Sequence, residues 1–154
     1  MKLRCRKWLE AGSTLAEVSV AIAVLAITGG ALIGAFNYGF FSMQMTRENQ
    51  RATQIMLEKA ETIRLYRWDQ VNTPGFIPAT FEDVYDPQAP VGSQGVTYYG
   101  TLSITNPPFA ATSYSSNLRQ LTITLTWTNS SGGIVRTRSL ATLIAKDGMQ
   151  NYVY

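Results

Sequence analysis

The sequence lacks the groups on which most enzymes depend. It has no histidine in 154 residues, which removes the commonest general base and metal ligand. Its one cysteine is Cys5, so thiolate catalysis and zinc–sulfur sites are excluded in the rest of the chain. The pair Gly132-Gly133 has no lysine at the offset that a phosphate-binding loop needs. The sequence therefore predicts no enzymatic activity and no cofactor or bound metal.

Charge is also scarce, at 15% of the residues, which is low for a soluble protein. No charged side chain occurs from Val18 to Thr46. Within that run, Val18–Phe36 is a mostly apolar segment of 19 residues. As a helix it spans roughly 29 Å, close to the hydrocarbon thickness of a bilayer. The segment from Val18 to Phe36 is therefore predicted to cross a membrane.

A polar step precedes this segment, with the sequence Gly12-Ser13-Thr14-Leu15-Ala16-Glu17. A lone carboxylate at the head of a membrane segment is costly unless it is paired, so Glu17 is a functional candidate. The arrangement resembles the type IV prepilin signal of type IV pilins and type II secretion pseudopilins. The resemblance implies cleavage between Gly12 and Ser13 by a prepilin peptidase, N-methylation of Ser13, and a role in assembly for Glu17. Ser13 and Ala16 depart from the residues usual in the family.

The charges of the proposed leader, residues 1–12, fix the expected orientation. This leader carries four basic residues and one acidic residue, and without it the formal charge falls from +3 to zero. The basic excess therefore does not indicate nucleic-acid binding. Short cationic flanks stay cytoplasmic, which predicts a single-pass protein of the bacterial inner membrane with its N-terminus inside. The C-terminal domain would be periplasmic, or extracellular in a filament.

Two other interpretations of the N-terminus stay open. A removed secretory signal has an apolar core of about 7–15 residues and a small-residue cleavage site, whereas the uncharged run here is longer and Glu17 precedes it. A plain signal anchor would explain the length of the segment and would leave Glu17 without a role. Gly29, Gly30 and Gly34 inside the segment suit close helix packing or the general abundance of glycine in membrane helices.

The helix is expected to continue beyond the membrane segment, since no proline occurs before Pro74. From Gln44 to Asp69 the pattern is amphipathic. The apolar stripe consists of Ala52, Ile55, Met56, Ile63 and Tyr66, with Lys59 as an exception. Two i,i+3 ion pairs are expected, Glu48/Arg51 and Glu61/Arg64. Residues 72–75 have turn chemistry that would end the helix.

A long connection without strands is expected from Pro74 to Gly95 because it contains four prolines. Glu82, Asp83 and Asp86 lie close together in it. They could bind calcium, as some pseudopilins do, but their spacing matches no calcium loop. Solvated loop charges are the alternative.

Three strands are predicted after this connection. Val96–Thr105 is rich in β-branched and aromatic residues, and Leu121, Ile123, Leu125 and Trp127 alternate with threonines. Residues 129–133 form a hairpin loop, and Ile134–Ala145 returns. The tail, residues 148–154, is apolar enough to dock. The predicted fold class is α+β, with a long N-terminal helix packed on a small antiparallel sheet, as in pilins.

The expected organisation is a removed leader (1–12), a membrane and filament-core helix (13–43) and an exported pilin-like domain (44–154). The resemblance implies a minor subunit of a type IV pilus-like or type II secretion filament, closest to the I-type minor pseudopilins. Its partners would be the prepilin peptidase, other pilin or pseudopilin subunits and the inner-membrane assembly platform. The rival function is a single-pass membrane protein whose exported domain binds a ligand or partner. A secreted hydrolase is disfavoured by the missing catalytic groups.

Overall fold

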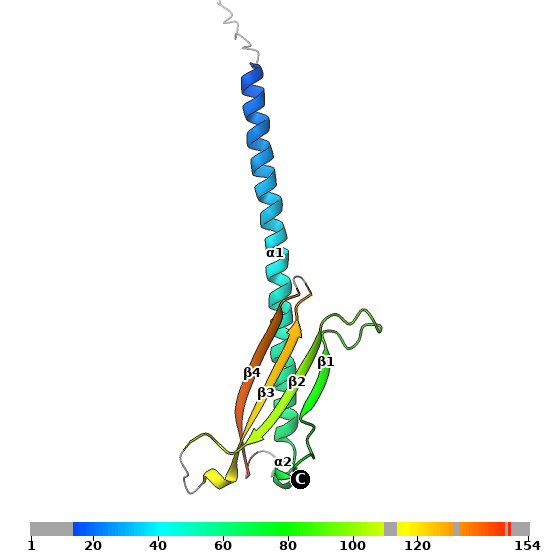
Figure 1. Ribbon diagram of the computed structural model, residues 1–154, viewed down its shortest axis with the longest axis vertical. Helices are drawn as coiled ribbons and strands as arrows, with labels where there is room; N and C mark the ends of the chain where they lie inside the picture. The colour runs from blue at the N-terminus through cyan, green and yellow to red at the C-terminus, as the bar shows by residue number, and fades with distance from the viewer. Residues whose placement is uncertain (1–13, 110–113, 131–132, 147, 149–154) are drawn as a thin grey trace, which may run out of the picture. The chain divides into compact units, whose positions relative to one another are not determined.

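The computed structural model describes residues 14–109, 114–130, 133–146 and 148. The described elements are two α-helices, one short 3-10 helix and four strands (Figure 1). The chain divides into two compact units, Met1–Phe41 and Ser42–Tyr154. Helix α1, Leu15–Arg64, contributes residues to both units. The residues of the predicted leader, and all of the C-terminal tail except Gly148, lie outside the described residues.

The second unit is built on one antiparallel sheet. Its strands are β1 (Thr80–Val84), β2 (Thr97–Thr105), β3 (Leu118–Thr128) and β4 (Val135–Ala145). They pair in chain order, β1-β2-β3-β4, and the short helix η1 (Ser115–Asn117) precedes β3. The later part of α1 packs on one face of this sheet (Figure 1). The predicted α+β fold class is confirmed.

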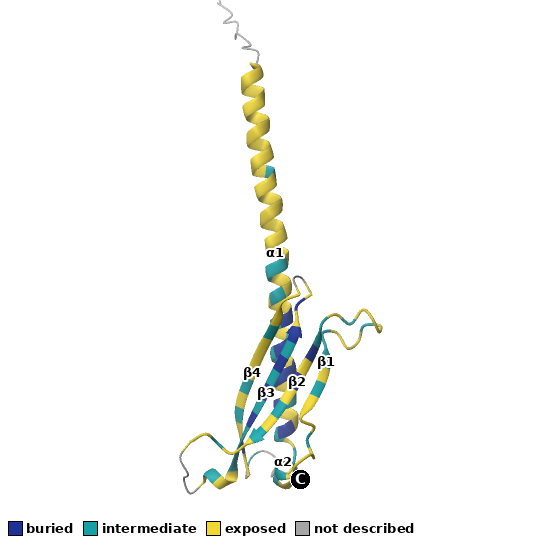
Figure 2. Ribbon diagram, in the orientation of Figure 1, coloured by how far each residue is buried: buried dark blue, intermediate teal, exposed yellow. Residues whose placement is uncertain are grey.

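Strand β3 forms the centre of the core because its side chains alternate between the two faces of the sheet. Its helix-facing residues Leu121, Ile123, Leu125 and Trp127 are all buried, as the alternation predicted. The intervening threonines point to the other face. Figure 2 shows the buried positions on β3 and on the part of α1 behind it. Burying each large apolar side chain stabilises the fold by about 1.5–3 kcal/mol.

The predicted stripe on α1 is confirmed, since Ala52, Ile55, Met56 and Ile63 are buried and Tyr66 packs against the same core. Lys59, the exception in the stripe, places its ammonium 5.0 Å from the centre of the Phe81 ring. Its charge therefore faces an aromatic ring at the edge of the core, which is a favourable arrangement.

The helix does not run on to residue 72, as the sequence had suggested. Helix α1 ends at Arg64 and a separate helix α2, Trp68–Asn72, follows. Leu65 and Tyr66 bond to carbonyls three residues back, those of Thr62 and Ile63, which tightens and closes the last turn. Arg67 is extended, with φ −63° and ψ 149°, and this conformation breaks the helix.

The expectation of a strandless connection from Pro74 to Gly95 is wrong, because β1 lies inside it. Each residue of β1 is paired with β2, from Thr80 opposite Thr101 to Val84 opposite Thr97. The prolines lie before and after β1 and not within it. They therefore leave its backbone N–H groups free to join the ladder.

Candidate functional site

The first turn of α1 is capped by Thr14. The Thr14 Oγ1 atom accepts a hydrogen bond of 3.3 Å from the backbone N–H of Glu17. The Thr14 carbonyl accepts the Val18 N–H at 3.2 Å. Thr14 is thus the N-cap, and Thr14-Leu15-Ala16-Glu17 matches the capping-box pattern. The pattern is visible in the sequence, although only the assembly role of Glu17 was predicted from it and Thr14 was not singled out.

Glu17 is exposed in the first turn of α1, where a negative charge interacts favourably with the helix dipole. Among the described residues, no basic side chain forms an ion pair with Glu17. Gly12 and Ser13 lie outside the described residues. The proposed cleavage junction and the proposed amino-terminal partner of Glu17 therefore stay predictions.

No described residue of its own unit covers the segment from Val18 to Phe36. Val18 is 46% exposed and Phe36 is 59% exposed. The other large apolar side chains exposed along this part of α1 are Leu15, Val20, Ile22, Val24, Leu25, Ile27, Leu32 and Ile33. So much contiguous apolar surface indicates a membrane or a protein partner.

By length and composition, α1 could cross a membrane. Its most apolar stretch of 18 residues has a mean hydropathy of 2.2, and none of that stretch is buried. A signal sequence near an N-terminus has the same properties, whereas the core helix of a soluble domain would be buried. These observations are compatible with a single-pass membrane protein.

The hydroxyl groups inside the apolar segment are bonded within the helix itself. Ser19 Oγ donates to the Leu15 carbonyl and Thr28 Oγ1 donates to the Val24 carbonyl, each at 2.8 Å. Both hydroxyl protons are therefore satisfied without water, as a hydrocarbon environment requires.

The glycines of the segment have no packing role inside the described chain. A Cβ atom added at Gly29, Gly30 or Gly34 would meet no other atom within 4 Å. Nothing in the described fold therefore requires a small residue there. If these glycines serve close packing, the neighbouring helix belongs to another chain. The alternative is the glycine content usual in membrane helices.

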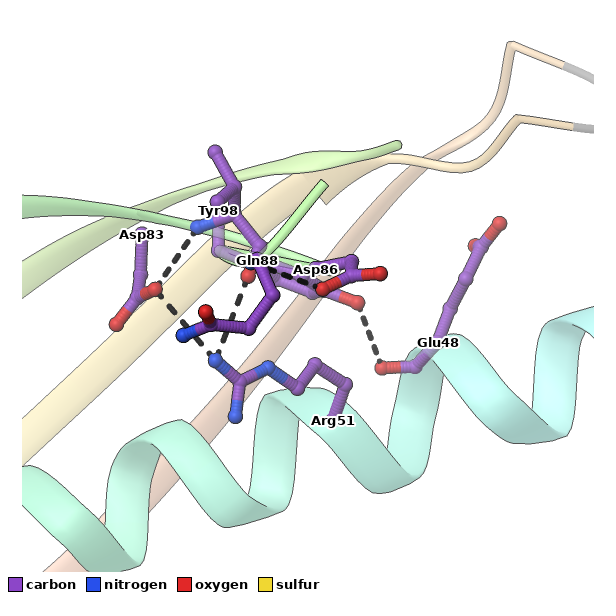
Figure 3. A network of polar contacts seen from close by, with 7 residues as sticks. Glu48, Arg51, Asp83, Asp86, Gln88 and Tyr98 are labelled. Carbon is purple, nitrogen blue, oxygen red and sulfur yellow. Dashed lines mark hydrogen bonds and ion pairs between the residues drawn. The ribbon is translucent and has the colours of Figure 1, made fainter. Parts of the chain in front are cut away.

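In the second unit, polar contacts join α1 to β1 and β2 (Figure 3). The Tyr98 hydroxyl donates a hydrogen bond of 3.0 Å to the backbone carbonyl of Glu48. Burial raises the pKa of the Tyr98 hydroxyl far above its ordinary value of 10.0, and the negative charge of Glu48 adds to the rise. Tyr98 therefore stays protonated and donates at any ordinary pH.

The expected Glu48/Arg51 ion pair is not formed. Arg51 instead lies beside β1, with Nη2 at 3.7 Å from Asp83 Oδ1 and 3.5 Å from the Val84 carbonyl. The other expected pair, Glu61/Arg64, is confirmed, with an N–O distance of 2.8 Å. The difference arises because the sheet brings Asp83 to the side of α1 on which Arg51 lies.

Glu48 is instead directed to the β3–β4 hairpin. Its Oε1 atom accepts the Ser130 N–H at 3.2 Å and also accepts the Ser130 hydroxyl. Gln44 Nε2 donates to the same hydroxyl oxygen at 2.5 Å. Glu48 is buried, with 4% of the residue exposed to solvent, and its Oε2 atom has no hydrogen-bond partner among the described atoms. These contacts hold the hairpin against α1.

The acidic residues of the predicted connection are not gathered into one site. Asp83 belongs to β1 and faces Arg51, while Glu82, its neighbour in the strand, is exposed on the opposite face. Asp86 Oδ1 accepts the Gln88 N–H at 3.0 Å. The part of the chain that the structure describes holds no group of three or more side chains able to bind a metal ion. The interpretation as loop charges is wrong for Asp83, which lies in strand β1 and pairs with Arg51 of α1.

The apolar part of α1 with Glu17 at its head is therefore the strongest candidate for a functional site. No family model, no curated protein and no solved structure matches the chain.

Proposed function

We propose that the chain is a subunit of a type IV pilus-like or type II secretion pseudopilus filament. A prepilin peptidase removes residues 1–12, and the remaining chain waits in the inner membrane with its second unit exported. The assembly platform then moves the apolar helix from lipid into a bundle of helices from related subunits. The function is structural, and the membrane segment becomes the core of the filament.

The observation that carries this proposal is the apolar segment Val18–Phe36, exposed in the chain and headed by Glu17. The fold class agrees with it, since a long N-terminal helix on an antiparallel sheet is consistent with a pilin-like fold. A membrane helix that moves from lipid into a helix bundle stays in apolar surroundings. The exposed apolar surface of the segment is therefore compatible with both the membrane state and the filament state.

Glu17 gives the assembly its specificity. Its carboxylate has no basic partner among the described residues, and an apolar bundle would not tolerate it unpaired. The α-amino group of Ser13, freed by cleavage in a neighbouring subunit, would supply a cation four positions before Glu17 in the sequence. The pair would form only between subunits, which makes assembly depend on processing.

A single-pass membrane protein with no filament role is the second candidate, and one observation favours it. The Glu17 carboxylate lies in the first turn of α1, where the helix dipole gives it a local role within its own helix. In that case the carboxylate lies at the membrane surface, and the second unit binds a ligand or partner on the exported side.

Intact-mass measurement of the protein extracted from membranes tests the proposal. For the wild-type protein we expect a mature chain that begins at Ser13. In the Gly12→Leu variant the bulky residue should block the cut. Ala11→Ser, next to the junction, serves as the matched control and should be processed normally. A mature chain that begins beyond Phe36 would show an ordinary removed signal and would refute the proposal.

A further inference from the structure

Two hollows meet at Arg119, at the end of the sheet where α2, the end of β2 and η1 come together (Figure 1). The first hollow has a volume of about 400 Å³ and is lined by Val71, Asn72, Ile104, Thr105, Asn106 and Arg119. The second has a volume of about 380 Å³ and is lined by Asn106, Pro107, Phe109, Ser115, Ser116 and Arg119. The two hollows therefore share one cation, Arg119, and one amide, Asn106.

The guanidinium group of Arg119 is held in place from one corner and one face. Its Nη1 atom donates to the carbonyls of Ser116 and Leu118, at 3.3 Å and 2.8 Å. Its Cζ atom lies 5.3 Å from the centre of the Trp68 ring, which is a favourable contact for a cation. The Nε and Nη2 atoms of Arg119 make no hydrogen bond to a described residue. Their two N–H groups share one edge, which is the fork that binds a carboxylate through two parallel hydrogen bonds.

The charge of Arg119 is not balanced by a carboxylate within the described part of the chain. Arg119 forms no ion pair there, and the residues that line the two hollows include no acid. Asp69 of α2 is exposed and lines neither hollow. From Pro87 to Lys146 the sequence has four basic residues and no acidic one. The site is therefore cationic and favours an anionic ligand.

Apolar side chains lie in the walls on both sides of this cation. Val71 and Ile104 line the first hollow, and Pro107 and Phe109 line the second. Phe109 is 41% exposed, so part of it is free to contact a ligand. A ligand that fills both hollows therefore has apolar groups on either side of its anionic group. A fatty acid has an apolar group on one side of its carboxylate only, whereas an acidic residue inside a peptide is flanked on both sides.

We propose that this site binds an extended acidic peptide, with a glutamate or aspartate carboxylate on the Nε and Nη2 atoms of Arg119. In an extended chain, side chains two positions apart point to the same side and are roughly 7 Å apart. Apolar residues two positions before and after the acid therefore enter the two hollows. The Asn106 amide, which lines both hollows, donates to the same carboxylate. The site lies wholly in the second unit, so the inference goes beyond the proposed filament function and does not depend on it.

Titration of the full-length chain, in uncharged detergent, with the peptide acetyl-Leu-Ser-Glu-Ser-Leu-amide tests the proposal. Trp68 reports on the site because the Arg119 guanidinium lies over its ring, and a Trp8→Phe background leaves only Trp68 and the buried Trp127 as tryptophans. We expect a saturable change in tryptophan fluorescence. The same peptide with glutamine in place of glutamate should bind at least about tenfold more weakly, because the charge-assisted pair is lost. Equal affinities for the two peptides, or no saturation below about 5 mM, would refute the proposal.

Substitution of Arg119 tests the contact itself. Arg119→Gln should weaken binding of the glutamate peptide about tenfold or more and remove the discrimination between the two peptides. Arg119→Lys keeps the charge without the fork and should give an intermediate affinity. Arg138→Gln is the matched control, since Arg138 lines neither hollow, and it should bind as the wild-type chain does. Circular dichroism checks the folding of each variant, and if Arg119→Gln unfolds, the comparison of the two peptides on the wild-type chain decides. Wild-type affinity in a folded Arg119→Gln variant would overturn the assignment.

Two further probes separate a peptide from other anions. Sodium hexanoate has an apolar chain on one side of its carboxylate only, so it should bind at least about fivefold more weakly than the glutamate peptide. Hexanoate binding as tight as that of the peptide would overturn the peptide as the ligand class. Displacement of the peptide by sodium phosphate at concentrations at which sodium acetate has no effect would overturn the carboxylate. Neither result changes the intact mass of the processed chain, so failure of this site leaves the proposed function standing.

Discussion

The ring of Phe81 on β1 lies where a side chain on Gly100 of β2 would stand. The two residues are register partners in the sheet. A Cβ atom at Gly100 would lie 2.2 Å from Cζ of Phe81, far inside the contact distance of two carbon atoms. Gly100 thus makes room for the aromatic ring that faces Lys59 of α1. The relationship joins three elements of the second unit, and it depends on one residue having no side chain.

A chain that begins at Ser42 should fold without the apolar segment. The buried apolar core contains no residue before Ala52 among the described residues, so truncation removes none of it. Circular dichroism and urea denaturation should show a helix–sheet spectrum and one cooperative transition. A soluble product that melts without cooperativity would show that a partner or the apolar segment completes the core.

Gly100→Ala should destabilise this truncated chain by about 1–3 kcal/mol, because the added methyl group forces the Phe81 ring to move. In a Phe81→Ala background the same change should cost less than about 0.5 kcal/mol, since the conflict is gone. Thr101→Ala, the next residue along β2 and exposed, is the control for the strand. Equal losses with and without Phe81 would show that Gly100 has another role.

The sequence predicted well the elements whose signals are local. The alternation through Leu121–Trp127 and the stripe through Ile55 and Ile63 follow from the periods of strand and helix. Each pattern can be read within about a dozen residues. The pairing of these two elements then followed, because each offered an apolar face that needed a cover.

The features that were missed depend on residues far apart in the chain. β1 has a short acidic sequence between prolines, and its strand character comes from its pairing with β2. Arg51 has an acceptable local partner in Glu48, yet β1 places Asp83 beside it instead. Gly100 carried no signal, because the reason for it is a ring about 20 residues earlier. The proposed role of Glu17 in assembly involves a second chain, whereas the single chain shows only the Thr14 hydroxyl capping the Glu17 backbone N–H.

Stability should fall above about pH 10 in a way that depends on Tyr98. Burial keeps the pKa of this hydroxyl raised in the folded protein, whereas it returns to about 10 on unfolding. Above that pH the unfolded chain releases the proton and the folded chain keeps it, so unfolding is favoured. The contribution is fully present below pH 10 and is lost as the pH rises from there towards the folded pKa.

Tyr98→Phe should remove this part of the alkaline loss, while costing about 1 kcal/mol at neutral pH through the lost bond to the Glu48 carbonyl. Tyr99→Phe, whose residue is 56% exposed, is the matched control and should leave the pH profile unchanged. Urea midpoints of the truncated chain between pH 7 and 11 measure both effects. Identical alkaline slopes for the wild-type chain and Tyr98→Phe would contradict the assignment.

The last prediction separates the two roles open to Glu17. If Glu17 serves only as the N3 residue of the Thr14 cap, glutamine can replace it, because an amide satisfies the same capping pattern. If the charge pairs with a neighbour's α-amino group inside an apolar bundle, the neutral amide leaves that cation unpaired, a loss of about 3–5 kcal/mol. The Glu17→Gln variant therefore keeps the helix start and removes the charge.

We expect Glu17→Gln and Glu17→Leu to insert in the membrane and to lose their leader as the wild-type chain does, yet to fail in assembly. Thr14→Ala is the reciprocal control, since it removes the cap at a cost of about 1 kcal/mol and keeps the charge. It should assemble nearly as well as the wild-type chain. Insertion, intact mass and subunit cross-linking are measured on the same membranes. Full cross-linking of Glu17→Gln, with a defect confined to Glu17→Leu and Thr14→Ala, would assign Glu17 to the cap and refute its role in assembly.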